Sequence, residues 1–122
     1  NPTECEGVAL AIRDSMKKGT AELVVLHLLR SGRKYGYQIA QEISSRSNGL
    51  FTLQEGSLYP TLYRLEKNGY VASQKEFSPN QQRIRKYYSI TEAGRAYFLE
   101  VREEYRQISE GIERILEECA ET

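Results

Sequence analysis

The sequence has few of the residues that catalysis or metal binding needs. Its 122 residues include one histidine, two cysteines and no tryptophan. His27 stands in an apolar run without a Cys or His nearby, and Cys5 and Cys119 lie at opposite ends of the chain, so no metal-ligand spacing is present. A nucleophile–base pair and a phosphate-cradling glycine loop are also missing. We therefore expect no enzyme, no cofactor and no metal. His27 is expected to be structural or solvated, and the cysteines are either free thiols or parts of one contact region.

The sequence also lacks any hydrophobic run near the ~20 residues that span a bilayer. Its apolar segment GVALAI is too short and too poorly flanked for a secretory signal. The length suits one domain with a modest core. We expect a cytoplasmic protein with no membrane partner.

The whole chain has no net charge, but its two parts carry net charges of opposite sign. The chain has 17 Lys and Arg and 17 Asp and Glu. Residues 1–90 contain 13 basic and 8 acidic side chains, a net charge of +5, whereas residues 91–122 contain 4 and 9, a net charge of −5. A basic front and an acidic rear indicate different partners for the two parts.

The first half of the chain predicts helices separated by turns. Residues 8–16 have the composition of a short helix. Thr20 resembles an N-cap whose side-chain oxygen accepts a hydrogen bond from the first turn of a second, buried helix. Another helix is predicted from about Gly36, where apolar residues recur with helical periodicity. Asn48-Gly49 signals a turn, and residues 50–52 suit a short strand.

The stretch EGSLYPTLYRLEKNGY, residues 55–70, predicts a further helix with a proline near its start. Its buried side is expected to consist of Leu58, Leu62 and Leu65. If Gly56 or Ser57 is the N-cap, Pro60 lies in the first turn, where its missing N–H would have had no helical partner. The Tyr, Thr and Arg side chains of the outer side suit a DNA groove, although they also suit an ordinary solvated surface.

Residues 70–77 and 83–90 predict two strands joined by the polar loop 78–82, which makes a β-hairpin. Its charged side chains are Lys75, Glu76, Arg83, Arg85 and Lys86. Directly after a helix-turn-helix, such a basic hairpin is a wing that touches the DNA backbone or the minor groove. Alternatively, the charges protect an edge strand from aggregation.

Residues 91–122 predict one long helix, capped by Thr91, with an acidic residue in its first turn. Apolar residues then recur at gaps of three and four, close to a heptad repeat. This seam consists of Tyr97, Val101, Tyr105, Ile108, Ile112, Ile115 and Cys119, broadened by Phe98 and Leu116. The pattern predicts that the helix pairs with its copy in a second chain.

The order of these elements predicts a winged helix-turn-helix, a mainly α fold with a small β-hairpin wing (α+β). In such proteins one helix reads the major groove and the preceding helix supports it. We expect a DNA-binding domain over residues 1–90, including the N-terminal helix at 8–16. Residues 91–122 are expected to form a dimerisation helix.

The chain resembles the PadR-type bacterial transcriptional regulators over residues 17–118. The motifs that carry the resemblance are KKGTAELVVLHLL, YGYQIAQEI, GSLYPTLYRLEKNGYV, RKYYSITEAG and the terminal helix. Any one fragment also fits other winged-helix regulators, but the combination is specific to this family. The single helix after the wing matches the family's smaller branch.

The resemblance implies a homodimer whose C-terminal and N-terminal helices form the interface. It also implies a repressor that binds an inverted-repeat operator in double-stranded DNA, near its own gene or a neighbouring one. Some members release DNA when they bind phenolic acids or planar drugs. The drug-binding members stack flat ligands between tryptophans, which this chain lacks. A small aromatic effector would instead meet Tyr97, Phe98 and Tyr105.

The family pattern also implies a DNA interface. Its helix-turn-helix contacts are Tyr37, Ser57, Tyr59, Pro60, Thr61, Tyr63 and Arg64. Its phosphate or wing contacts are Lys67, Arg83, Arg85, Lys86 and Tyr88. Arg64 is expected to touch a base edge, because a guanidinium bonds guanine in bidentate fashion. Tyr37 and Tyr59 have the alternative of packing between helices with only their hydroxyls outward. The alternative to a DNA-binding regulator is a winged-helix module that binds protein.

Overall fold

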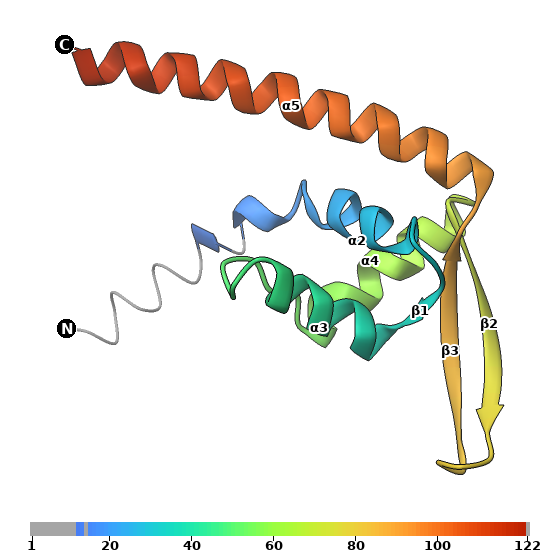
Figure 1. Cartoon of the computed structure of the whole chain (residues 1–122). Helices are drawn as coiled ribbons and strands as arrows, with labels where there is room; N and C mark the ends of the chain where they lie inside the picture. The colour runs from blue at the N-terminus through green and yellow to red at the C-terminus, as the bar shows by residue number, and fades with distance from the viewer. Residues whose placement is uncertain (1–11, 14, 122) are drawn as a thin grey trace, which may run out of the picture.

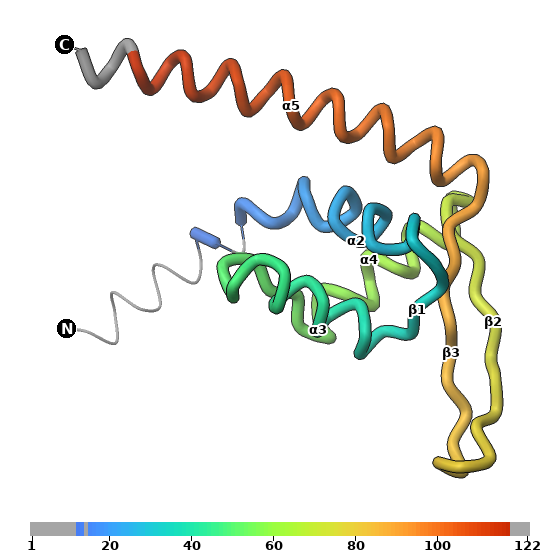
Figure 2. Tube along the Cα trace, viewed as in Figure 1, coloured from blue at the N-terminus to red at the C-terminus, as the bar shows by residue number. Residues whose placement is uncertain are grey.

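The computed structural model describes residues 12, 13 and 15–121 and, after residue 117, the backbone alone. Its elements are α2 (Ala21–Leu29), β1 (Lys34–Tyr35), α3 (Gly36–Arg46), α4 (Glu55–Lys67), β2 (Val71–Ser78), β3 (Arg83–Ile90) and α5 (Glu92–Glu121) (Figure 1). Helices α2, α3 and α4 form the body, the β2–β3 hairpin projects beyond it, and α5 runs across α2 (Figures 1 and 2). The predicted fold, mainly α with a β-hairpin wing, is confirmed. The helix predicted at 8–16 lies largely outside the described residues.

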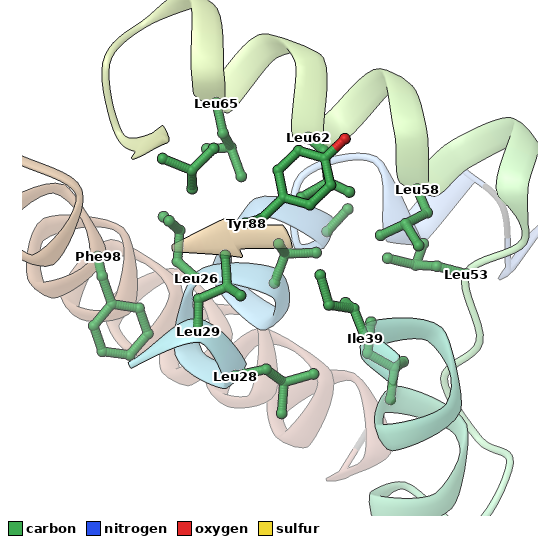
Figure 3. Packing of buried hydrophobic residues seen from close by; sticks show 14 residues of the cluster. Leu26, Leu28, Leu29, Ile39, Leu53, Leu58, Leu62, Leu65, Tyr88 and Phe98 are labelled. Carbon is green, nitrogen blue, oxygen red and sulfur yellow. The ribbon is translucent and has the colours of Figure 1, made fainter. Parts of the chain in front are cut away.

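One apolar core joins the helices of the body to the root of the hairpin and the start of α5. The leucines predicted for the inner side of α4, Leu58, Leu62 and Leu65, are buried (Figure 3). Tyr88 of β3 and Phe98 of α5 complete the same cluster. Fully burying one such leucine contributes about 1.5–3 kcal/mol. The core therefore holds α4 by its leucine side, and the opposite side of the helix is exposed to solvent.

The sheet has three antiparallel strands in the order β1-β3-β2. The two hairpin strands are confirmed, but β1 was not predicted, since two residues are too few for an alternating pattern. The strand predicted at residues 50–52 is wrong. There the hydroxyl of Ser47 accepts a hydrogen bond from the N–H of Phe51 (3.0 Å) and donates one to its carbonyl (2.9 Å), so these backbone groups bond to a turn rather than to a strand.

Threonines stand before two helices but act differently. Thr20 is the N-cap of α2, as predicted, but its hydroxyl donates to the Lys17 carbonyl at 3.2 Å and makes no capping bond, so the expected side-chain hydrogen bond is wrong. Thr91 is the expected cap of α5, because its hydroxyl accepts the Gly94 N–H at 3.0 Å. It also donates to the Gly69 carbonyl at 2.7 Å. A Cβ at position 94 would lie 2.0 Å from the Tyr70 carbonyl oxygen, so only glycine allows this close contact.

Pro60 lies deeper in α4 than expected. The N-cap is Gln54, rather than Gly56 or Ser57, and Pro60 is the sixth helical residue. The Leu58 N–H already bonds to the Gln54 carbonyl at 2.8 Å, so the first helical bond forms before the proline. Pro60 therefore removes the donor that would normally serve the carbonyl of Gly56. Both residues are exposed, so this break lies on the outer side of α4, where water can replace the bond.

Candidate nucleic-acid interface

A groove of about 490 Å³ lies between the starts of α3 and α4 and strand β3. It brings together residues predicted to contact DNA from three elements. Those that line it are Tyr37, Tyr59, Arg83, Arg85, Lys86 and Tyr88. Aromatic side chains from the helices thus face cations from the wing across one opening, which is the chemistry that phosphate and sugar contacts need.

Gly36 explains how Tyr59 reaches this groove. A Cβ at position 36 would lie 2.6 Å from the Tyr59 hydroxyl, so the ring packs directly over the start of α3. Tyr59 nevertheless remains exposed, and Tyr37, one residue after the glycine, is exposed as well. Tyr59 therefore packs between helices and still presents surface, whereas Tyr37 projects outward.

The outermost side of α4 is opposite its leucines. With 100° between successive residues, this side carries Pro60, Tyr63 and Lys67, all of them exposed. Glu55 and Tyr59 flank it toward the wing, and both line the groove beside β3. This ridge is short and has one cation.

Arg64 lies on the other flank, toward α2. Its Nε is 3.7 Å from Glu22 Oε1, and its Nη2 donates to Thr61 Oγ1 at 3.3 Å. Glu22 also accepts the Tyr97 hydroxyl of α5 at 2.8 Å. The predicted base reader is therefore held by an acidic residue that also bonds to α5.

Two predicted contacts are buried. Thr61 is 2% exposed, and its hydroxyl donates to the Ser57 carbonyl at 2.9 Å, so it cannot serve as a DNA contact in this conformation. Tyr88 is 5% exposed and packs among the core leucines (Figure 3). Burial raises the pKa of its phenol. Tyr88 borders the groove, but its ring is part of the core rather than of the surface.

The wing cations have partners of different kinds. Lys86 Nζ is 3.8 Å from Glu66, whose carboxylate also accepts the Ser73 hydroxyl. The Arg85 guanidinium lies 4.3 Å above the ring of Tyr35, a cation–π contact. This contact holds Arg85 to β1 and keeps it at the side of the groove.

Lys17 and Lys18 were not predicted as part of the surface. They border a second groove of about 560 Å³, together with Ser57, Pro60 and Arg64. The pair KK directly before the second predicted helix was the available signal. It was missed because its nearness to α4 depends on tertiary packing.

The apolar side chains of the predicted seam are exposed to solvent over the second half of α5. Tyr105, Ile108, Ile112, Ile115 and Leu116 are between 50% and 61% exposed. Val101 is half-buried, and the Cys119 side chain lies outside the described residues. An apolar hollow of about 770 Å³ separates this stretch from α2 and from residues 50–51.

Tyr97, the first residue of the predicted seam, packs within its own chain. Its ring stacks on Tyr70, with 4.0 Å between centroids and 3° between planes. The hydrogen bond to Glu22 raises the pKa of Tyr97 to about 12. The prediction that Tyr97 faces a second chain therefore does not match its position here.

The described part of the chain has no helix that is both long and apolar enough to cross a bilayer. Within the same residues, no group of three or more His, Cys, Asp or Glu side chains is placed to hold a metal ion.

Comparison with known proteins identifies the family. The family model described as "Transcriptional regulator PadR-like family" matches residues 25–100. The chain belongs to the PadR-like family. An uncharacterized protein X of Lysinibacillus sphaericus is 36% identical to it over 107 residues, which cover 87% of this chain and 96% of that protein. The transcriptional regulator Rv3488 of Mycobacterium tuberculosis is 30% identical over 93 residues, 76% of this chain and 82% of that protein.

Solved structures of PadR-like and related regulators share the fold. A PadR family transcriptional regulator from Eggerthella lenta matches with a TM-score of 0.80 and 25% identity, covering 94% of this chain and 97% of that chain. A transcriptional regulator from Clostridium thermocellum matches with a TM-score of 0.76 and 32% identity, covering 82% and 96%. The protein is therefore a PadR-like transcriptional regulator with a DNA-binding winged helix.

Proposed function

We propose that the protein is a homodimeric repressor that binds an inverted-repeat operator near its own gene or a neighbouring one. The observation that carries the proposal is the groove between α3, α4 and the wing, which is lined by the exposed Tyr37 and Tyr59 together with Arg83 and Lys86. Beside it runs the exposed ridge of α4. This arrangement fits a helix in the major groove with cations on the flanking phosphates.

The proposed DNA surface consists of the predicted contacts that remain accessible. They are Tyr37, Ser57, Tyr59, Pro60, Tyr63, Arg64, Lys67, Arg83, Arg85 and Lys86, and we add Lys17 and Lys18. Arg64 joins this surface by exchanging Glu22 for a base edge. The exchange costs little, because the Arg64 side chain is already 52% exposed and Glu22 keeps the Tyr97 hydroxyl as a partner. Thr61 and Tyr88 are left out because they are buried.

The second chain is proposed to pair along α5. Five large apolar side chains at heptad-like spacing remain exposed between Tyr105 and Leu116, which is what an unpaired dimer helix presents. Residues 1–90 then form the DNA-binding unit and residues 91–122 the dimerisation unit. Pairing α5 with its copy fixes the distance between two reading helices and therefore the spacing of two half-sites.

The acidic character of α5 supports this division of roles. Its acidic residues pair along the helix, as Arg106 with Glu103 at 2.7 Å and Arg114 with Glu110 at 2.9 Å. Hydrogen bonds from Arg106 and Gln107 lower the pKa of Glu103 to about 2, so this carboxylate stays charged. A negative helix repels phosphates and favours an orientation in which α5 lies away from the duplex.

A small aromatic effector is proposed for the hollow beneath α5. The hollow is lined mainly by apolar side chains, among them Val24, Phe51 and Tyr105. A flat ligand here would press against α2 and α5 together. It would change the angle between α5 and the body and so move the two reading helices off their half-sites.

Salt titration of binding to duplex DNA tests the proposal. We expect the logarithm of the binding constant to fall linearly with the logarithm of salt concentration, because phosphate contacts release counterions. Arg83→Gln should reduce this slope by about 1, since it removes one phosphate contact. Ser89→Ala, on an exposed position of the same strand, is the matched control and should leave the slope unchanged. A protein that binds no duplex at low salt would favour the protein-binding alternative.

A further inference from the structure

The tip of the wing carries two large apolar side chains that the DNA surface above does not use. Phe77 of β2 and Ile84 of β3 lie directly opposite each other in the hairpin. They are 62% and 66% exposed, although they neighbour each other across the strands. The loop 79–82 follows Phe77 after one residue, so this pair is next to the end of the hairpin.

The register places this pair on the inner side of the wing. Because paired residues share a face, Phe77 and Ile84 lie on the same side as the buried Tyr88 and as the Lys75–Lys86 pair. Ile84 also lines the groove that contains Tyr37 and Tyr59. The end of the hairpin extends beyond the helical body (Figure 2). The register and the groove therefore place the apolar pair on the side on which DNA is proposed to bind.

The length of the strand sets the reach of the tip. Ile84 lies four residues from Tyr88, which is about 13 Å at ~3.3 Å per residue. This distance is comparable with the ~12 Å width of the major groove. With α4 in that groove, the tip extends past one phosphate backbone toward the adjacent minor groove.

A purely structural role explains part of this pair. Cross-strand apolar pairs stabilise hairpins, and single exposed apolar residues are common. The neighbouring pair, however, is Lys75 opposite Lys86, and like charges that face each other destabilise a hairpin. Glu66, 3.8 Å from Lys86 Nζ, offsets only part of this repulsion, because this ion pair is open to solvent. An anion placed over both lysines would relieve this repulsion. A phosphate backbone supplies that anion and lies beside an apolar groove wall formed by sugars.

We infer that Phe77 and Ile84 enter the minor groove beside each half-site, with Lys75 and Lys86 on the phosphates that border it. This inference rests on the proposed DNA binding. Apolar side chains in the minor groove press on the sugars, partly unstack a base step and bend the duplex. The cost of bending depends on the sequence, so the tip adds specificity at base pairs that form no hydrogen bonds with the protein.

The test compares wild type with the double variant Phe77→Ser/Ile84→Thr. The probe is a duplex recovered by the wild-type protein from a pool of random sequences. We expect the double variant to bind this duplex about tenfold more weakly. The bend, measured by energy transfer between dyes on the two ends, should decrease, while the salt slope stays unchanged because no phosphate contact is lost.

Two controls separate this role from hairpin stability. Phe77→Leu retains apolar bulk and should keep most of the affinity and bend, whereas Leu99→Ser removes an equally exposed apolar side chain from α5 and should change neither. Shortening the duplex on its outer flanks should weaken wild type but not weaken the double variant further. This last comparison is informative even if the substitutions loosen the hairpin, because it depends on the wild-type protein, whose affinity should fall when the flank is removed.

Several results would overturn the inference. These are equal affinity and bend in the double variant, a reduced salt slope in that variant, or a wild-type protein indifferent to the shortened flanks. Failure of the wild-type protein to enrich any duplex would instead overturn the proposed function.

Discussion

Helices α4 and α5 carry leucine and isoleucine at similar helical spacing, yet they use them in opposite ways. In α4, Leu62 is wholly buried within the chain, whereas Ile112 of α5 remains 50% exposed. The body therefore completes its own core, and the second half of α5 does not. This difference supports the proposal that the exposed apolar stripe packs against a partner, and its heptad-like spacing favours another α5 as that partner.

The largest expected effect on stability is in the body. Leu62→Ala should lower the free energy of unfolding by about 2–5 kcal/mol, since it leaves a cavity in a close-packed core. Chemical denaturation monitored by circular dichroism measures this change. Ile115→Ala is the matched substitution on α5, and its smaller effect should fade as the protein is diluted and the dimer dissociates. A large, concentration-independent effect of Ile115→Ala would show that α5 is stabilised within its own chain.

The next effect separates two arginines of the proposed DNA surface, Arg64 as a base contact and Arg85 as a phosphate contact. Arg64→Ala should cost about 1–3 kcal/mol of binding at one base position, and Arg85→Ala should weaken all duplexes alike. Binding assays with single base-pair changes in the selected duplex measure both. Glu22 pairs with Arg64 within the chain, so Glu22→Gln should release the guanidinium and strengthen DNA binding. Arg64→Ala should have the opposite effect and weaken it. Uniform losses in both arginine variants would remove Arg64 from base reading.

The smallest effect concerns the link between α5 and the body. The hydrogen bond to Glu22 raises the pKa of Tyr97 to about 12, above the ordinary value of 10.0. The stabilisation that follows is complete below pH 10 and is lost as the pH rises through 12, because the unfolded state ionises first. Absorbance titration of the phenolates should show a tyrosine that titrates at about pH 12, in addition to Tyr88, whose pKa is also raised, by burial. This latest titration should disappear in Tyr97→Phe and persist in Tyr105→Phe, and its persistence in Tyr97→Phe would contradict the assignment.

Periodicity predicted most of the fold because each long element has one dominant side. The leucine stripe of α4 and the alternation of the hairpin are signals within one segment. By contrast, β1 exists because Lys34 and Tyr35 pair with Tyr88 and Tyr87, far along the chain. No local pattern shows such a pairing.

The sequence predicted most residues of the candidate site, but it did not predict which of their side chains are buried. Tyr37, Tyr59 and Arg83, all predicted to contact DNA, line one groove. Thr61 lies next to the leucine stripe on the helix, and the packing of α2 against α4 decides that it is buried. The apolar tip was not predicted, because the pairing of Phe77 with Ile84 depends on the register of the hairpin, and single exposed apolar residues are common.

The mass of the complex between the protein and the selected duplex tests the division between a reading body and a pairing helix most directly. Sedimentation at micromolar concentration should show two chains on each inverted repeat. The double variant Ile108→Asp/Ile112→Asp should be monomeric and bind about 100-fold more weakly or worse, because the two half-sites are no longer engaged together. One chain per duplex in the wild type, or full affinity in the monomeric variant, would contradict this division.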